Sequence, residues 1–137
     1  MKTINWQKLG RISVCIDNAN LIHSPTKLGW KVGLEKLSLF ARQSGNLVDI
    51  KLFDSIPLVA DLDKLRKFHK DIFTQAEHDL YAKRSLGQNK IFNRAQSDWG
   101  ITVFTKPLRF IADFEKRQVI PKGDCDIDMV VEVIRKR

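Results

Sequence analysis

The chain has 137 residues and carries 24 Lys and Arg against 16 Asp and Glu, which gives a formal net charge of +8. This length fits a single domain, and a content of 43% hydrophobic and 29% charged residues excludes a disordered or collagen-like chain. No apolar run approaches the ~20 residues of a membrane-spanning helix, so no membrane partner is expected.

The excess of basic residues favours a polyanionic partner, and nucleic acid is the commonest polyanion inside a cell. The alternative is a basic surface that only keeps the protein solvated, because the Lys and Arg residues are spread along the chain. The cysteines, Cys15 and Cys125, lie far apart in the sequence and form no disulfide framework. The start of the chain lacks the apolar core of a secretory signal, and together these features predict a cytoplasmic protein.

Short β-prone runs alternate with amphipathic segments along the chain. We expect strands at 11–17, 47–53 and 101–105. Helices are expected at 34–42, 62–76 and 91–99, and from residue 124 onward, while 108–120 is ambiguous between an irregular segment and a small hairpin. This alternation predicts an α/β fold, a parallel sheet with crossover helices in which the first strand is central.

Carboxylates follow the first two predicted strands. Asp17 comes at the end of the first strand and Asp54 directly after the second. In open parallel sheets, ligands bind beyond the carboxyl ends of the strands, so both residues are candidates for a site. The alternative for Asp17 is a structural role in a turn or as a helix cap, because Asp and Asn favour both positions.

Three more carboxylates lie at the start of the last predicted helix. Acids at this position stabilise a helix through its dipole, which is the alternative to a functional role. At ~100° per residue, Asp126 falls within the apolar stripe of the helix and is expected to point toward the core. Asp128 and Glu132 are expected on the solvated face, and Asp124 as a cap of the helix.

Two inward carboxylates at one sheet edge, Asp17 and Asp126, suit a hard divalent cation. Mg²⁺ takes one or two protein carboxylates and keeps several waters. In a basic domain, such an ion indicates phosphodiester chemistry. The glycine-rich phosphate-binding loops and the nucleophile elbow of hydrolases have no match in the chain.

Five segments in order resemble the NYN domain, the LabA-like branch of the PIN-like nuclease superfamily. They are VCIDNANLIH (14–23), LGWKVGLEKL (28–37), IKLFDSIP (50–57), GITVFTKPLR (100–109) and KGDCDIDMVVEVI (122–134). Each segment alone is a weak signal, but together they cover nearly the whole chain.

The resemblance implies a Rossmann-like three-layer α/β/α sandwich with a mainly parallel sheet and a Mg²⁺ or Mn²⁺ site. It implies endonucleolytic cleavage of RNA, single-stranded or structured. Asp17, Asn20 and Asp126 correspond to the catalytic residues of the family, with Asp17 and Asp126 as the metal ligands. Further acidic candidates are Asp54, Asp124, Asp128 and Glu132, and candidate RNA-binding residues are Lys106, Arg109 and Lys122.

The family normally continues into a further strand and a motif of the S-G-D-x-D-F type that supplies more acids. The chain ends before any such motif, so we expect one domain over 1–137 that lacks its C-terminal strand or strands and part of the site. The leading interpretation is a metal-dependent ribonuclease domain. The alternative is a catalytically inert module of the same fold that binds RNA or a protein, and a homo-oligomer is a further option.

Overall fold

The computed structural model describes residues 5–21, 29 and 32–135, with the backbone alone for residues 6 and 7. Parts of the segments 14–23 and 28–37, and all of 136–137, lie outside the described residues. In chain order the elements are the 3-10 helix η1 (Trp6–Leu9), β1 (Ile12–Asp17), α2 (Leu34–Arg42), β2 (Leu47–Ile56), α3 (Val59–Phe68), α4 (Gln75–Ser97), β3 (Thr102–Pro107), β4 (Arg109–Asp113), β5 (Gln118–Lys122) and α5 (Asp126–Arg135). None of the helices in these ranges is long and apolar enough to cross a membrane.

A parallel sheet of three strands, in the order β1-β2-β3, confirms the α/β expectation. The expectation that the first strand is central is wrong for this sheet, because β2 lies in the middle and β1 at an edge. Residues 51–57 are all buried, as is typical of a strand covered on both faces. β1 is mostly half-buried, with Ser13 exposed and Ile16 buried.

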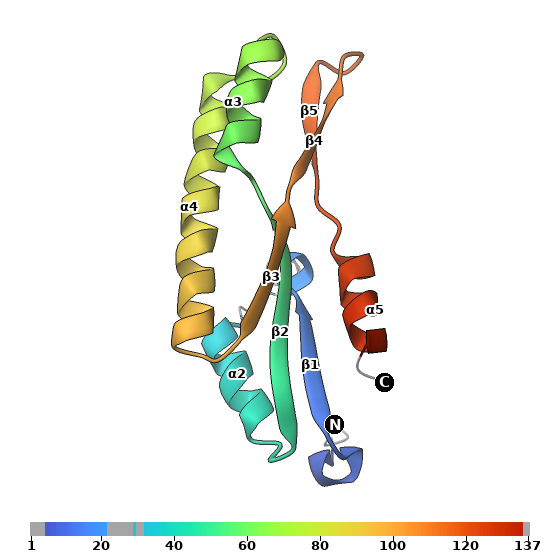
Figure 1. The fold of residues 1–137 in the computed structure, drawn as a ribbon. Coiled ribbons are helices and arrows are strands. Elements are labelled where there is room, and N and C mark those ends of the chain that lie inside the picture. The colour runs from blue at the N-terminus through green and yellow to red at the C-terminus, as the bar shows by residue number, and fades with distance from the viewer. Residues whose placement is uncertain (1–4, 22–28, 30–31, 136–137) are drawn as a thin grey trace.

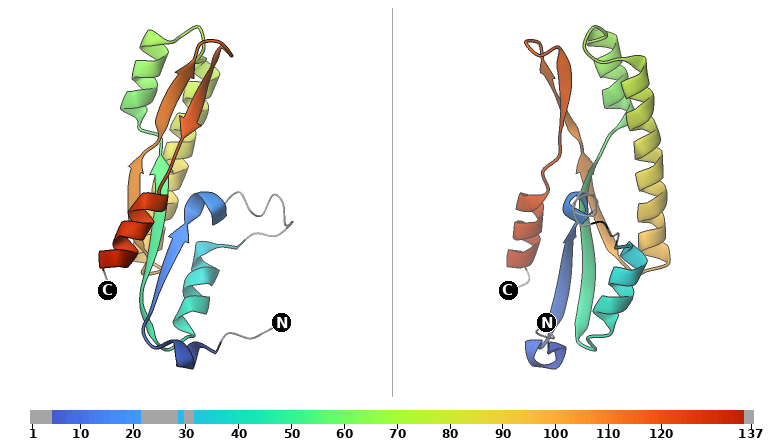
Figure 2. Two further views of the ribbon diagram at one scale, coloured as in Figure 1. Left: turned by 90° about the vertical axis from the view of Figure 1, so that its right-hand side faces the viewer. Right: turned by 180° about the vertical axis from the view of Figure 1, so that it is seen from behind.

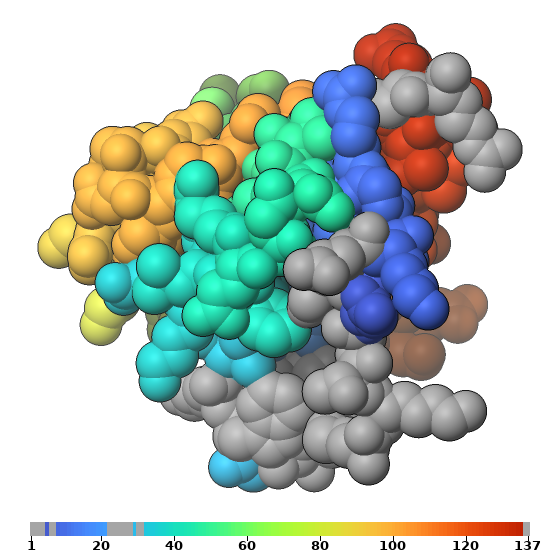
Figure 3. Space-filling model, turned by 90° about the horizontal axis from the view of Figure 1, so that it is seen from below, coloured from blue at the N-terminus to red at the C-terminus, as the bar shows by residue number. Residues whose placement is uncertain are grey.

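The main hydrophobic core lies between one face of the sheet and the helices α2 and α4 (Figure 1). Ile50 and Leu52 of β2 contribute to it from the sheet, and Phe92 and Ala95 from α4. Gly45 closes α2 with a φ of +74°, as its Ser-Gly-Asn ending predicts. Figure 3 looks onto the end of the sheet where this turn and the start of β1 reach the surface.

The opposite face of the sheet carries Lys51 beside the stacked rings of Phe53 and Phe104, and among the described elements α5 is the helix that covers it (Figure 2). Lys51 projects from this face and pairs with Glu132 of α5, and Lys106 pairs with Asp128 at 2.7 Å. The expected orientation of the helix is therefore wrong: most of the apolar stripe faces solvent, with Val130 56%, Val133 50% and Ile134 62% exposed. The reason is that a buried ammonium group requires a carboxylate, so the acidic side of the helix turns inward.

A single helix at 62–76 is also a wrong prediction, since α3 ends at Phe68 and α4 begins at Gln75. The predicted helix at 91–99 is the last part of α4. A capping box starts α4, in which Thr74 accepts from the backbone N–H of Glu77 and Glu77 accepts from that of Thr74. The pattern Thr-x-x-Glu is a signal for a helix start within an amphipathic run.

The segment that the sequence leaves ambiguous forms a hairpin, with β4 and β5 paired antiparallel. The hairpin projects beyond the sheet and lies opposite α3 and the start of α4 (Figure 1). Phe110 of β4 contacts Phe73 and Tyr81, with ring centroids at 6.2 and 5.1 Å. These aromatic contacts hold the hairpin against the helices and thereby fix the position of its base near the sheet edge.

His78 connects the two helices through a pH-sensitive contact. Its Nε2 lies 2.8 Å from Asp63 of α3 and its Nδ1 lies 3.1 Å from Asp79. Hydrogen bonds to Asp63 and Asp79 raise the pKa of His78 above its ordinary value of 6.5.

A raised pKa in the folded state stabilises the protein below the unfolded pKa, and this contribution is lost as pH rises through the folded value. We expect the free energy of unfolding to fall by less than about 1 kcal/mol as the pH rises through neutrality, since both carboxylates are exposed. Urea unfolding at pH 5.5 and 8.5 measures this change. The His78→Gln variant should lose that part of the pH dependence, and an unaltered profile would contradict the assignment.

Candidate functional site

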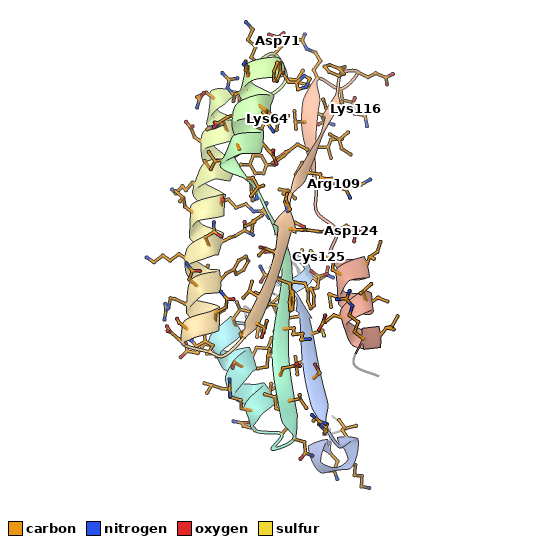
Figure 4. All side chains as sticks on the ribbon, in the orientation of Figure 1. Lys64, Asp71, Arg109, Lys116, Asp124 and Cys125 are labelled. Atoms are coloured by element: carbon orange, nitrogen blue, oxygen red, sulfur yellow. The ribbon has the colours of Figure 1, made fainter. Side chains whose placement is uncertain are left out.

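A cleft of about 540 Å³ opens at the carboxyl edge of the sheet, between the end of β1 and the segment that joins β5 to α5. Residues from distant parts of the chain line it, because the carboxyl ends of parallel strands meet at one edge. Its polar lining includes carboxylates, an amide and basic groups, namely Asp17, Asn20, Asp54, Arg84, Lys122, Asp124 and Asp126. Figure 4 shows Asp124 and Cys125 between the base of the hairpin and α5.

Asp17 is the last residue of β1 and lies on the wall of this cleft. Its Oδ1 accepts hydrogen bonds from the backbone N–H groups of Ala19 at 3.0 Å and Asn20 at 3.3 Å. Its Oδ2 accepts from Nδ2 of Asn20 at 2.6 Å. Asp17 therefore does cap the helical turn at 18–21, and the same bonds fix its carboxylate at the sheet edge.

Asp54 does not follow the second strand, as the sequence suggests, but lies inside it, because β2 continues to Ile56. The side chain is 4% exposed and accepts hydrogen bonds from Asn18 at 2.6 Å and Gln88 at 2.9 Å. The backbone N–H of Ser55 donates to it as well, at 2.8 Å. Neutral amides thus satisfy this buried carboxylate, which explains its place in the structure without a ligand.

The segment after β5 passes close above β2. A Cβ atom on Gly123 would lie 2.9 Å from the Cβ of Ser55, so the close approach requires glycine here. Asp124 then accepts a hydrogen bond from the backbone N–H of Asp126 at 3.1 Å, so it holds the first N–H of α5, although Cys125 occupies the cap position because its carbonyl accepts from Met129. Burial is the main cause that raises the pKa of Cys125, whose Sγ lies 3.5 Å from the hydroxyl of Ser55.

Asp126 is the first residue of α5 and is exposed, not directed into the core. It nevertheless lines the same cleft as Asp17, so the structure brings these two predicted residues to one opening. The sequence predicts that Asp126 points toward the core with the apolar stripe of the helix. It does not, because α5 turns its acidic side, and not this stripe, toward the sheet. Its exposure leaves the carboxylate accessible from solvent.

The remaining predicted residues divide between two places. Asp128, Glu132 and Lys106 line a separate, smaller cleft between α5 and the sheet, where all three belong to ion pairs. Hydrogen bonding to Asp128 is the main cause that raises the pKa of Lys106. Arg109 and Lys122, in contrast, lie directly opposite each other on β4 and β5.

Two residues near the site were missed by the sequence analysis. Arg84 comes from the middle of α4 and lines the cleft beside the carboxylates. No sequence signal distinguishes it from the other exposed basic residues of that helix. Gln88, one helical turn further on, holds Asp54, and a buried glutamine in a charged helix cannot be recognised without the partner it contacts.

The oxygen ligands that the cleft offers fit a cation that keeps most of its coordinating water molecules. Carboxylate oxygens are the ligands that Mg²⁺ and Mn²⁺ prefer, and Mg²⁺ uses one or two of them together with waters. Asp17 and Asp126 supply such oxygens from different chain segments. Within the described ranges, no group of three or more His, Cys, Asp or Glu side chains is placed to hold a metal ion, so protein ligands would fill only part of a coordination shell.

Comparison with protein-family models, with curated proteins and with solved structures gives no match to this chain. The fold and the cleft define an α/β protein with a carboxylate-lined opening at the edge of a parallel sheet.

Proposed function

We propose that this chain is a metal-dependent ribonuclease domain of the PIN-like, Rossmann-type three-layer class, acting on RNA in the cytoplasm. The observation that carries the proposal is the meeting of Asp17 and Asp126, which lie 109 positions apart in the chain, at one cleft with Arg84 and Lys122. Like charges gathered at an opening repel one another, and a bound cation would remove that repulsion. In a chain of net charge +8, an acidic cleft with basic residues at its side suits a metal ion beside a phosphate.

Asp17 and Asp126 would hold the ion, which when bound neutralises phosphate charge and activates water. The chain's own contribution is to orient these carboxylates. Asn20 and the backbone of the turn at 18–21 fix Asp17, while Asp124 fixes the start of α5 and so the position of Asp126. Arg84 and Lys122 supply positive charge for the phosphate oxygens of the RNA backbone.

A second candidate is an inert module of the same fold that binds RNA or a protein. The observation in its favour is that both oxygens of Asp17 already accept hydrogen bonds within the turn that it caps. A carboxylate with these partners has fewer lone pairs for a metal ion.

Self-association of the chain stays a prediction.

Metal binding separates the two candidates. Titration of Mn²⁺, followed by the loss of the free-ion electron paramagnetic resonance signal, should give weak binding in the millimolar range, and Asp126→Asn should weaken it about tenfold. Asp128→Asn removes the same charge two residues further on, where the carboxylate pairs with Lys106 instead, and serves as the matched control. Equal affinities in all three proteins would contradict the metal assignment.

A further inference from the structure

A second cleft, of about 560 Å³, lies between α3 and the hairpin β4–β5. We refer to it as the hairpin groove. It shares Leu108, Lys122 and Asp124 with the carboxylate cleft, so the two clefts adjoin each other. Figure 4 shows Lys64 on α3 and Arg109 on β4, above Asp124. A polymer chain bound at the carboxylate cleft therefore lies next to this groove.

Basic side chains from both walls line the hairpin groove. Arg109 and Lys122 face each other across the β4–β5 ladder, and Lys64 projects from α3 with 73% of its side chain exposed. The ion pairs formed among the described residues include neither Arg109 nor Lys122, whereas Lys64 lies 3.8 Å from Asp61. Two cations without a carboxylate partner on one wall attract a chain of phosphates.

An exposed aromatic ring lies on the opposite wall. Phe68, the last residue of α3, is 68% exposed although it lines the groove. Its ring has Lys67 Nζ at 5.4 Å from the centroid. A groove that combines an exposed aromatic ring with cations can stack unpaired bases while the cations hold the backbone.

We propose that the hairpin groove binds single-stranded RNA next to the carboxylate cleft, with a base stacked on Phe68 and phosphates held by Arg109 and Lys122. The proposal rests on the proposed ribonuclease function, and it assigns to this groove the preference for unpaired RNA. A duplex keeps its bases stacked on each other, so it can use the cations but not the ring.

The test is fluorescence anisotropy with a labelled 12-nucleotide single-stranded RNA and a labelled duplex of similar length, in EDTA and at two salt concentrations. Phe68→Ala should weaken binding of the single strand about 5- to 20-fold, leave duplex binding unchanged, and be rescued by Phe68→Tyr. Arg109→Ala should weaken binding of both and reduce the slope of log K against log salt by about 0.7. Leu86→Ala and Lys90→Ala on α4, which line neither cleft, are the matched controls.

The proposal is overturned if Phe68→Ala and Arg109→Ala bind the single strand as tightly as the control variants do. It is also overturned if the wild type binds the duplex as tightly as the single strand. Because EDTA removes divalent cations, this test is independent of catalysis. Asp17→Asn should bind the single strand in EDTA at least as tightly as the wild type. If Phe68→Ala and Arg109→Ala bind RNA like the controls while cleavage still depends on Asp17, only the proposal for the groove is refuted. If both variants weaken RNA binding but the wild type does not cleave RNA, the groove is supported and the ribonuclease proposal is refuted.

Discussion

Replacement of Glu132 by Ala is expected to lower the free energy of unfolding by about 2–3 kcal/mol. Lys51, its partner, is only 6% exposed and lies on the central strand beneath α5. Removal of one partner of a buried ion pair costs about 3–5 kcal/mol, because the other charge stays buried without compensation. The effect here should be smaller, because Asp49 lies 3.9 Å from the same ammonium group and Glu132 is 21% exposed.

Urea unfolding of Glu132→Ala measures this loss, with Asp128→Ala as the matched control on the same helix. The pair of Asp128 with Lys106 is more exposed, at 53% and 35%, and its removal should cost less than about 1 kcal/mol. The double variant Lys51→Met/Glu132→Leu should be nearly as stable as the wild type, because apolar packing can replace a buried pair. Equal losses for the two single variants would contradict this description of how α5 is held.

Local patterns sufficed for most of the fold. The helix at 34–42 and the positions of the three parallel strands follow from residue preferences and turn signals within a few neighbours, whereas the hairpin at 108–120 was only one of two options. The order of the strands could not be obtained in this way. The local sequence of β1 does not indicate that this strand pairs with β2 alone in the sheet. Which strands are neighbours depends on packing between segments that are distant in the sequence.

The orientation of α5 shows where periodicity fails. The apolar stripe around Val130 predicts an inward face, but the face that turns inward is set by Lys51, a residue inside the otherwise apolar run of β2. A lysine in a strand gives no sign that it will be buried, and its need for a carboxylate outweighs the stripe. Glu132 and Asp128 pair with lysines of the sheet for this reason, although their spacing is that of a solvated face and Asp128 stays 53% exposed.

The candidate site was accessible to sequence reasoning only in part. Asp17 lies at the carboxyl end of a strand and Asp126 at the start of a helix, and both positions follow from topology. Asp54 was misplaced because β2 continues past it into Ser55 and Ile56. Arg84 could not have been found, because it depends on the path of a long helix across the sheet edge.

Cleavage of RNA should depend on Asp17 more strongly than on any other single residue outside the core. Asn at position 17 keeps a side-chain oxygen that can accept from the backbone of Ala19, so the turn at 18–21 should persist. The charge that would hold a cation is nevertheless lost, and Asp126 alone cannot fix the ion in place. We expect the rate to fall by at least about 10²-fold, because a displacement of about 1 Å at a reacting centre has a cost of that order.

The decisive measurement is the rate at which the wild-type chain, Asp17→Asn and Asp128→Asn cleave an end-labelled single-stranded RNA, with Mn²⁺ and with EDTA. We expect slow cleavage by the wild type that requires Mn²⁺, the same rate in Asp128→Asn, and no detectable cleavage in Asp17→Asn. Cleavage that is unchanged in Asp17→Asn, or a wild-type chain that binds the RNA and does not cleave it with Mn²⁺, would contradict the proposal that the cleft between Asp17 and Asp126 is a ribonuclease site.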